Sequence, residues 1–477
     1  MFRVVHIVTS DNGGAGRACV RLHSALLKAG LESFIITKNK SSNLNNIQEL
    51  KQSKFNKSLT KSIRNISLLP FRSSIKKASD YFSPNINIPF LSDNNKSLLQ
   101  QIDSISPDII HLHWIEGGFV NIHSLASITK PIIWSLHDEN AYTGGCHYVA
   151  NGCNENMFKC KLCPLLPKPS RVSYLTFINK QETYKKINIT INGLSSWIAT
   201  RAKESLLLQD KSIINLPNPI DTNLYKPLNK AFARKALCID SNKILLAFGA
   251  IGGSSIKRKG FAQLKAALEM LNDKNKYELV VFGGQSQDID GINVINLDVL
   301  HDDATLVLLY NACDIFIQPS LAENLSNAIM ESLSCGTPVI AFNIGGNMDM
   351  INHKINGYLA KPLDAKDLSN GIEWFANLNL EQKEDISNNA RNSILSKFDY
   401  KVVAPMYIAV YKEMLGGGGV IPLLSFSFTS FNATYSLYLI LIFNYLSLNN
   451  LLHIISQYIN KINILHSYQL NLVDSYD

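Results

Sequence analysis

Short apolar runs alternate with longer segments of helical periodicity through residues 1–415. The apolar runs predict buried strands, and the segments between them predict helices. Strands that alternate with helices are typical of α/β proteins with parallel sheets. The expected strands are residues 4–8, 108–113, 131–136, 243–249, 278–284, 293–297, 314–319 and 338–342, and the clearest helices are residues 17–29, 261–271 and 406–415.

The chain has 477 residues, of which 46% are apolar, so it is too long for one ordinary core and suits two domains. Pro217, Pro219 and Pro227 interrupt regular structure, which places a linker near residues 216–227. The first residues, MFRVVHIVTS, lack an apolar segment followed by a small-residue cleavage site. We therefore expect a buried first strand there and no signal peptide.

The most informative polar pattern is SLAENLSNAIMESLSCG, residues 320–336, in which Glu323 and Glu331 stand eight positions apart. On a continuous helix that spacing corresponds to roughly 12 Å, whereas a glycosidase needs its two carboxyl groups roughly 5–10 Å apart. The pair therefore suits two parts of one long ligand, with phosphate at the helix N-terminus between them. A nucleotide sugar has that form. A solvated helix with two surface glutamates is the alternative.

This segment resembles the E-x7-E signature of retaining glycosyltransferases of family 4, which have the GT-B fold of two facing Rossmann-like domains. The resemblance implies that Glu323 lies against the donor sugar and that Glu331 holds the ribose hydroxyls. It also implies that the backbone N–H groups of Leu325 and Ser326 bind phosphate. The family more often has glycine or an aromatic residue after the first Glu, where this chain has Asn324 and Leu325. That departure concerns the identity of the sugar more than the reaction class.

Near the N-terminus, DNGGAG (residues 11–16) predicts a tight loop between a strand and a helix. A plain turn is the alternative, but Gly13 and Gly14 match a family loop that faces the active cleft. His137 follows a predicted strand, and the resemblance implies that it reaches the donor sugar or its phosphate. His111 and His113 end the preceding strand, and for them we favour a structural role.

In the predicted second domain, Lys259 matches a family lysine that neutralises the donor diphosphate. Ala250 occupies the place of the family's arginine, so Arg258 or Lys257 would have to substitute for it. A solvated loop is the alternative for these three basic residues. The resemblance covers roughly residues 1–415, includes the crossover motif at residues 218–221, and implies that the closing helix returns to the first domain. Pro405 suits the first turn of that helix.

Four cysteines lie close together in TGGCHYVANGCNENMFKCKLCP: Cys146, Cys153, Cys160 and Cys163. The last two form C-x2-C, the usual spacing for one metal in structural zinc sites. Free cysteines in an irregular insertion are the alternative, because the other spacing is not standard for zinc. The arrangement resembles a subset of family 4 enzymes of exopolysaccharide and O-antigen synthesis. We expect the segment, residues 144–165, to shape the acceptor side beside His137, and we expect no catalytic metal.

The net charge of +8 has a local source, since residues 51–77 contain basic residues and no acidic one. Helical geometry places the bases from Lys51 to Arg64 on one side, and Phe55, Leu59, Ile63 and Ile66 on the other. Pro70 then ends the run. Peripheral contact with an anionic membrane and a surface helix packed on its own domain are equal alternatives. Nucleic acid is not expected, since no recognition motif accompanies these bases.

Residues 416–477 differ in kind from the rest. Four glycines precede a segment, residues 420–477, with three formal charges only: Lys461, Asp474 and Asp477. Residues 420–448 are long enough for a membrane anchor, but they contain several Ser and Asn residues. Our hypothesis is that a G-rich tract shifted the reading frame, so that this tail is non-functional and poorly ordered.

We therefore expect a GT-B enzyme: an acceptor domain at residues 1–216, a nucleotide-sugar domain at 217–398, a closing helix at 399–415 and an atypical tail. It would be a retaining glycosyltransferase that moves a sugar from a UDP- or GDP-linked donor to a lipid-linked glycan for the bacterial surface. We expect it in the cytoplasm, peripherally at the inner face of the membrane. The alternatives are a nucleotide-sugar epimerase or hydrolase of the same fold, and a non-catalytic nucleotide-sugar binder.

Overall fold

The computed structural model describes residues 2–416, except residues 78–80, 86–94, 150–152, 154–158, 162, 167–170, 250–255, 286 and 301. Ala250, where the family has an arginine, lies outside these described residues, and so does the tail from residue 417 onward. None of the helices in the described part of the chain is long and apolar enough to cross a membrane.

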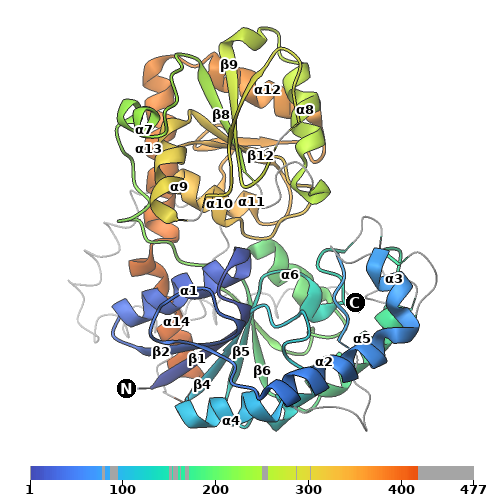
Figure 1. The fold of residues 1–477 in the computed structure, drawn as a ribbon. Helices are drawn as coiled ribbons and strands as arrows, with labels where there is room; N and C mark the ends of the chain where they lie inside the picture. Colours follow the sequence, from blue (N-terminus) through green and yellow to red (C-terminus); the bar gives the residue numbers. More distant parts are fainter. Residues whose placement is uncertain are drawn as a thin grey trace, which may run out of the picture. The chain divides into compact units, whose positions relative to one another are not determined.

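The N-terminal half of the described chain forms a seven-stranded sheet in the order β3-β2-β1-β4-β5-β6-β7 (Figure 1). Every pair of neighbouring strands is parallel. The central strands are buried along their length, as their continuous apolar runs predict. The strands are β1 (Arg3–Ser10), β2 (Glu32–Asn39), β3 (Ile47–Glu49), β4 (Ile109–Leu112), β5 (Ile132–Leu136), β6 (Ile189–Gly193) and β7 (Ser212–Asn215).

A second, six-stranded sheet follows residues 216–229 and has the order β10-β9-β8-β11-β12-β13. Its strands are again all parallel. The predicted α/β class with two Rossmann-like halves is therefore confirmed. The strands are β8 (Ile244–Gly249), β9 (Tyr277–Phe282), β10 (Asn293–Leu297), β11 (Ile315–Gln318), β12 (Val339–Phe342) and β13 (Gly357–Ala360).

Helices connect the strands and cover the sheets. In the first half they are α1 (Gly13–Lys28), α2 (Lys54–Leu68), α3 (Arg72–Lys77), α4 (Lys96–Ile105), α5 (Arg171–Tyr184) and α6 (Ser196–Glu204). In the second half they are α7 (Lys230–Ala236), α8 (Phe261–Glu269), α9 (Asp303–Ala312), α10 (Asn327–Ser334), α11 (Asn347–Met350), α12 (Ala365–Ala376) and α13 (Leu380–Lys397). Helix α14 (Tyr400–Met414) ends the described chain.

Helix α14 packs on the first sheet, although it follows the second sheet in the sequence. Val403, Ala404, Tyr407 and Tyr411 are buried in one cluster with residues of β1, β4, β5 and α1. The closing helix therefore returns to the first domain, as the family resemblance implied. It begins at Tyr400, so Pro405 lies inside the helix and not in the predicted first turn. Asp399 caps the start by accepting a hydrogen bond from the N–H of Lys401.

Two other helix starts differ from the prediction. Helix α1 begins at Gly13, because Asn12 caps it, so the two glycines form its first turn and not a preceding loop. Helix α10 begins at Asn327 behind the cap residue Ser326, which accepts a hydrogen bond from the N–H of Ile329. Glu323 therefore precedes the helix, and the assumption of one continuous helix between the two glutamates was wrong.

The predicted basic helix is present as α2. The guanidinium of Arg64 donates to the carbonyl of Gly117 at 3.3 Å, so this side chain is only partly exposed. Ile66, expected on the apolar side, is 58% exposed, and Leu69 in the following turn is 63% exposed. Lys57 and Lys61 are exposed as predicted.

Candidate active site

The loop between β11 and α10 carries Glu323 and is held by close backbone approaches. A Cβ atom at Gly345 would lie 1.8 Å from the carbonyl oxygen of Glu323, so only glycine fits there. The N–H of Gly346 donates to the carbonyl of Asn324 at 3.0 Å. Gly260 approaches the carbonyl of Pro319 equally closely, which brings the turn before α8 against the same loop. These contacts fix the backbone around Glu323.

The carboxylate of Glu323 lies among basic groups of the turn before α8. Lys259 Nζ is 2.8 Å from Glu323 Oε2, and an Arg258 guanidinium nitrogen is 3.8 Å from the same oxygen. Gln318 also donates to it at 3.2 Å. Burial alone would raise the pKa of Glu323, but Lys259, Arg258 and the N–H of Asn324 outweigh it and hold the pKa below its ordinary value. Glu323 is therefore ionised at neutral pH.

Glu331 lies on α10 and is 3% exposed. Its Oε1 accepts from Arg21 at 2.6 Å and from Arg17 at 3.3 Å, and both arginines come from α1. Its Oε2 accepts from the hydroxyl of Tyr310 at 3.0 Å. These three partners of Glu331 were not predicted from the sequence. The i, i+4 spacing of Arg17 and Arg21 just after the glycine pair was the available signal, since it places both on one helix face.

The N-termini of α1 and α10 meet at the glycine pair. The side-chain amide of Asn327 donates to the carbonyl of Gly14 at 2.9 Å. Gly13 has a φ of +73°, and a Cβ atom at Gly13 or Gly14 would find no atom within 4 Å. The space in front of the two glycines is thus open to a ligand. Leu325 and Ser326, the predicted phosphate-binding residues, form the turn that leads into α10.

His137 follows β5 on the first-domain side of this site. The carbonyl of its neighbour Leu136 accepts from the side chain of Asn324 at 2.9 Å, which ties the end of β5 to the Glu323 loop. His137 Nε2 is 3.0 Å from His113 Nδ1. Burial lowers the pKa of His137 to about 4, although Asp138 acts in the opposite sense. His137 is therefore neutral at neutral pH.

The cysteine segment packs beside this histidine. His147 donates from Nδ1 to the carboxylate of Asp138 at 2.7 Å, and the guanidinium of Arg258 lies over the ring of Tyr148 at 5.1 Å. Cys146 Sγ and Cys163 Sγ are 3.8 Å apart, and both lie in a small apolar cluster with Phe82, Leu166 and Val172. Cys160 Sγ accepts from the N–H of Gly144.

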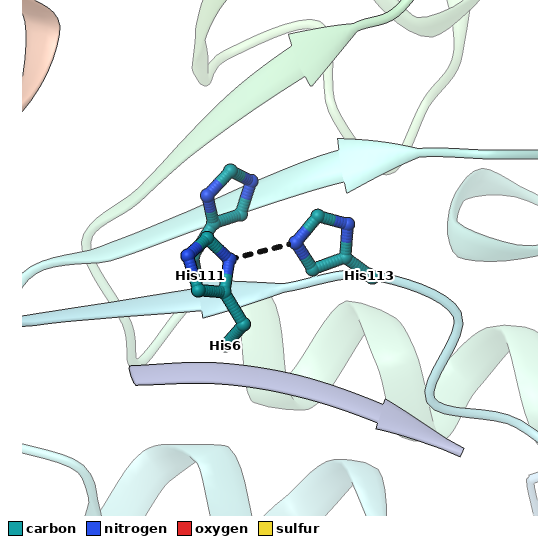
Figure 2. Close-up of side chains that lie close together, drawn as sticks. All are labelled: His6, His111 and His113. Carbon is teal, nitrogen blue, oxygen red and sulfur yellow. Dashed lines mark hydrogen bonds between the residues drawn. The ribbon is translucent and has the colours of Figure 1, made fainter. Parts of the chain in front are cut away.

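Within the described residues, a single group of three potential metal ligands has its ligand atoms within 4.8 Å of one another. That group is His6, His111 and His113 (Figure 2), and not a set of cysteines. The structure therefore brings two of the four predicted thiols together but does not assemble the four. The structural zinc stays a prediction.

Comparison with known proteins identifies the second half of the chain. Residues 234–393 match the family described as glycosyl transferases group 1. This part of the chain therefore resembles a group 1 glycosyltransferase domain. The matched residues contain Lys259, Glu323 and Glu331, whereas Gly13, Gly14 and His137 of the same site lie outside the match.

Relatives of the group 1 domain support this assignment. An uncharacterized glycosyltransferase of Methanocaldococcus jannaschii is 24% identical over 327 residues, which are 65% of this chain and 77% of that protein. The N,N'-diacetylbacillosaminyl-diphospho-undecaprenol alpha-1,3-N-acetylgalactosaminyltransferase of Campylobacter jejuni is 26% identical over 186 residues, 38% of this chain and 47% of that protein. The chain thus spans about half the length of some curated relatives and three quarters of another.

Solved structures show the same fold over most of the chain. A glycosyltransferase from Rickettsia africae aligns with a TM-score of 0.60 and 16% identity, over 87% of this chain and 99% of that chain. Anabaena HepE, solved in complex with UDP-glucose, aligns with a TM-score of 0.58 and 14% identity, over 87% of this chain and all of that chain. The two-sheet architecture of the protein is therefore GT-B.

Proposed function

We propose that the protein is a retaining glycosyltransferase that moves a sugar from a nucleoside-diphosphate donor to a hydroxyl group of a glycan acceptor. One observation carries the proposal. Glu323 and Glu331 stand on either side of the N-terminus of α10, with Lys259 beside Glu323 and the open glycine pair facing the helix start. Two carboxylates with a cationic, N–H-rich region between them match the sugar, diphosphate and ribose of a nucleotide sugar.

The proposal assigns a role in the reaction to each group. Lys259 and the N–H groups of Leu325 and Ser326 neutralise the diphosphate as the bond between it and the anomeric carbon breaks. Glu323 and His137 position the sugar, and Glu331 accepts hydrogen bonds from the ribose hydroxyls. The acceptor hydroxyl oxygen bonds to the anomeric carbon as the bond from that carbon to the diphosphate oxygen breaks, and the hydroxyl proton passes to the departing diphosphate. No step requires a metal ion.

Residues 1–216 would then bind the acceptor, and residues 217–398 the donor. A lipid-linked acceptor is supported by the name of the Campylobacter relative, which contains a diphospho-undecaprenol acceptor. The fold is also shared with WaaG, described as involved in lipopolysaccharide biosynthesis, at a TM-score of 0.55 and 14% identity. We infer surface-polysaccharide synthesis at the cytoplasmic face of the membrane.

Helix α2 and the turn after it supply a surface for that membrane. Exposed Ile66 and Leu69 are accompanied by exposed basic residues on the same segment, Lys57, Lys61, Arg72 and Lys76. Apolar side chains among lysines and arginines favour the interface of an anionic bilayer. We infer that the protein binds the membrane peripherally through this segment.

The proposal is tested first by a thermal-shift panel of nucleoside diphosphates and their sugars. A ligand that binds only the folded protein raises the melting temperature, and at 100 times Kd the stabilisation is about 2.7 kcal/mol. The donor found in this way is then incubated with and without a diphospho-polyprenol-linked glycan. We expect a product only with the acceptor. Conversion of the donor alone would indicate an epimerase or hydrolase, and binding without any turnover would indicate a non-catalytic binder.

A further inference from the structure

The core of the first domain contains a group of three histidines, His6, His111 and His113, that have no role in the proposed reaction. His6 lies on β1 directly beside His111 on β4, and His113 follows two residues later on the same face of the sheet (Figure 2). The three are 0%, 0% and 1% exposed. The next strand, β5, ends just before His137. The group therefore extends from the middle of the sheet to the proposed active site.

His6, His113 and His137 form one continuous hydrogen-bonded chain. His6 Nδ1 is 3.0 Å from His113 Nε2, the bond drawn as a dashed line in Figure 2, and His113 Nδ1 is 3.0 Å from His137 Nε2. His111 is not part of the chain. Its two ring nitrogens bond instead to the hydroxyl groups of Tyr411 and Ser135, at 2.7 and 2.8 Å. Each nitrogen of His113 thus has one imidazole partner.

The geometry does not suit a metal ion shared by the three buried rings. An imidazole nitrogen binds a metal in the plane of its ring, so three ligands must have planes that converge on one point. The planes of His111 and His113 differ by only 21° with centroids 4.4 Å apart, which is a stacked arrangement. The plane of His6 differs from them by 33° and 38°. Because both nitrogens of His111 already have partners, the chain of hydrogen bonds is the better description.

The chain consists of neutral imidazoles. Burial lowers the pKa of His6 and His113 well below the ordinary value and that of His137 to about 4. Asp138 is the one charged group that acts on His137 in the opposite sense, and it is itself engaged by His147 and the indole N–H of Trp114. A neutral imidazole has one N–H donor and one acceptor nitrogen. His113, in the middle of the chain, can therefore donate to one neighbour only and must accept from the other. Both hydrogen bonds thus point the same way, either from His6 toward His137 or from His137 toward His6.

The two directions differ at the ends of the chain. If the protons point outward, from His6 toward His137 and the proposed active site, His6 and His113 donate from Nδ1. The proton of His137 is then on its own Nδ1. If they point inward, His137 donates from Nε2, and a proton remains on His6 Nε2. That buried nitrogen has no hydrogen-bond partner among the described residues. Because orphaned buried N–H groups are rarer than orphaned acceptors, the outward direction is favoured.

We propose that His6 and His113 are positioning residues that hold His137 as the tautomer with its proton on Nδ1, which makes His137 a hydrogen-bond donor toward an oxygen of the sugar or diphosphate. This inference rests on the proposed function for the identity of that oxygen. The tautomer itself is a property of the protein without substrate, and it can be measured separately.

The direct test is nitrogen NMR of the full chain labelled with ¹⁵N-histidine, in which the couplings between ring nitrogens and ring carbon protons report the tautomer. The signals of His137 are those that disappear in the His137→Gln variant. We expect a neutral ring with its proton on Nδ1 at pH 7. A proton on Nε2, or a charged ring, would overturn the proposal whether or not the protein transfers sugar.

Two substitutions of similar size test the positioning effect. In His113→Asn the side-chain amide stands where Nδ1 was, so the donor to His137 is kept. In His113→Gln the amide stands where Nε2 was, so that donor is lost. We expect His113→Asn to keep the tautomer and kcat within about threefold. We expect His113→Gln to lower kcat by about tenfold to a hundredfold, by analogy with the outer partners of metal-binding imidazoles. Equal losses in both variants would contradict the proposal. If the wild-type protein transfers no sugar, the proposed function fails while the NMR result still decides the tautomer.

Discussion

Lys259 and Glu323 form a close charged contact at the sugar end of the proposed donor site, at 2.8 Å. Lys259 is predicted to have two partners in turn, since it neutralises Glu323 in the free protein and the diphosphate once the donor is bound. That double role makes it the most informative single residue for the chemistry. Its neighbour Lys257 lies exposed in the same turn and has the same charge, so it provides a matched comparison.

We therefore predict that Lys259→Met lowers kcat by about 10²–10³-fold, the effect of removing one preorganised group that stabilises developing charge. Lys257→Met should leave kcat within about twofold. The measurement is steady-state sugar transfer with the donor identified by the thermal-shift panel. A loss in Lys257→Met as large as that in Lys259→Met would mean that the turn supplies only general positive charge.

The sequence predicted residues of the site only where they belong to a recognisable motif. The spacing of Glu323 and Glu331 and the position of Lys259 were recognisable from the sequence. Arg17, Arg21 and Tyr310 were not, because their contacts with Glu331 join segments up to 314 positions apart. A structural role was expected for His113, because a single histidine in a sequence is most often a satisfied structural residue. Its link to His137 depends on the register of β4 beside β5, which no local pattern specifies.

At the scale of elements, the loop that carries Glu323 depends on two close glycine contacts. Gly345 has a φ of +52°, and a Cβ atom there would collide with the carbonyl of Glu323. Gly30 has a φ of +82°, but a Cβ atom there would meet no atom within 4 Å. Alanine at Gly30 therefore tests the left-handed backbone alone, and alanine at Gly345 tests the left-handed backbone and the collision together.

We predict that Gly345→Ala lowers the melting temperature by at least about 4 °C more than Gly30→Ala. Both variants carry the left-handed strain of about 1–2 kcal/mol, and only Gly345→Ala must also displace the Glu323 loop. Differential scanning calorimetry measures the difference. Equal shifts in the two variants would show that the loop yields without cost.

Helix α2 provides a prediction about the membrane. Ile66→Glu combined with Leu69→Glu should reduce sedimentation with vesicles that contain anionic lipid by at least about fivefold, because the change removes the exposed apolar contact and adds repulsion. Leu380→Glu changes an exposed leucine at the start of α13 and serves as the control. Binding that is unchanged by the double substitution would exclude this segment as the membrane contact.

The strands with the strongest apolar runs were predicted, and the others were missed. The eight expected strands appear within a few residues of their apolar runs, because strands buried on both faces leave a continuous apolar signal. Strands β2, β3, β6, β7 and β13 were not predicted from the sequence. The starts of α1 and α10 were placed wrongly, although Asn12 and Ser326 are typical capping residues. The helical pattern of α2 was clear from the sequence. The contact of Arg64 with the carbonyl of Gly117 was not, because amphipathicity does not specify which basic side chain bonds to a neighbouring loop.

At the scale of the whole molecule, the buried histidines predict how stability depends on pH. Burial lowers the pKa of His23 and His137 to about 4 and that of His111 to about 3, and it lowers those of His6 and His113 well below the ordinary value. The unfolded chain binds protons at these positions near pH 6.5, and the folded protein does so only at lower pH. Their contribution to stability is therefore complete above pH 6.5 and is lost as pH falls toward 4.

We predict that the free energy of unfolding falls by several kcal/mol between pH 6.5 and pH 5, with each pKa unit per histidine contributing about 1.4 kcal/mol. Urea titrations at a series of pH values measure this slope. The variant His23→Gln should reduce the dependence of stability on pH, since it removes one titrating group. Glu384 is an exposed carboxylate, and the control variant Glu384→Gln should leave that dependence unchanged. A stability that is flat over this range would mean that the histidines are already solvated in the folded protein.

The proposed function depends most on the position of the donor along the start of α10, with Glu323 at its sugar and Glu331 at its ribose. Calorimetric titration of the nucleoside diphosphate and of its sugar into the wild type, Glu323→Gln and Glu331→Gln tests this placement. We predict that Glu331→Gln weakens both ligands by about tenfold or more, and that Glu323→Gln weakens only the nucleotide sugar. Unchanged affinity for both ligands in both variants would contradict the placement of the donor.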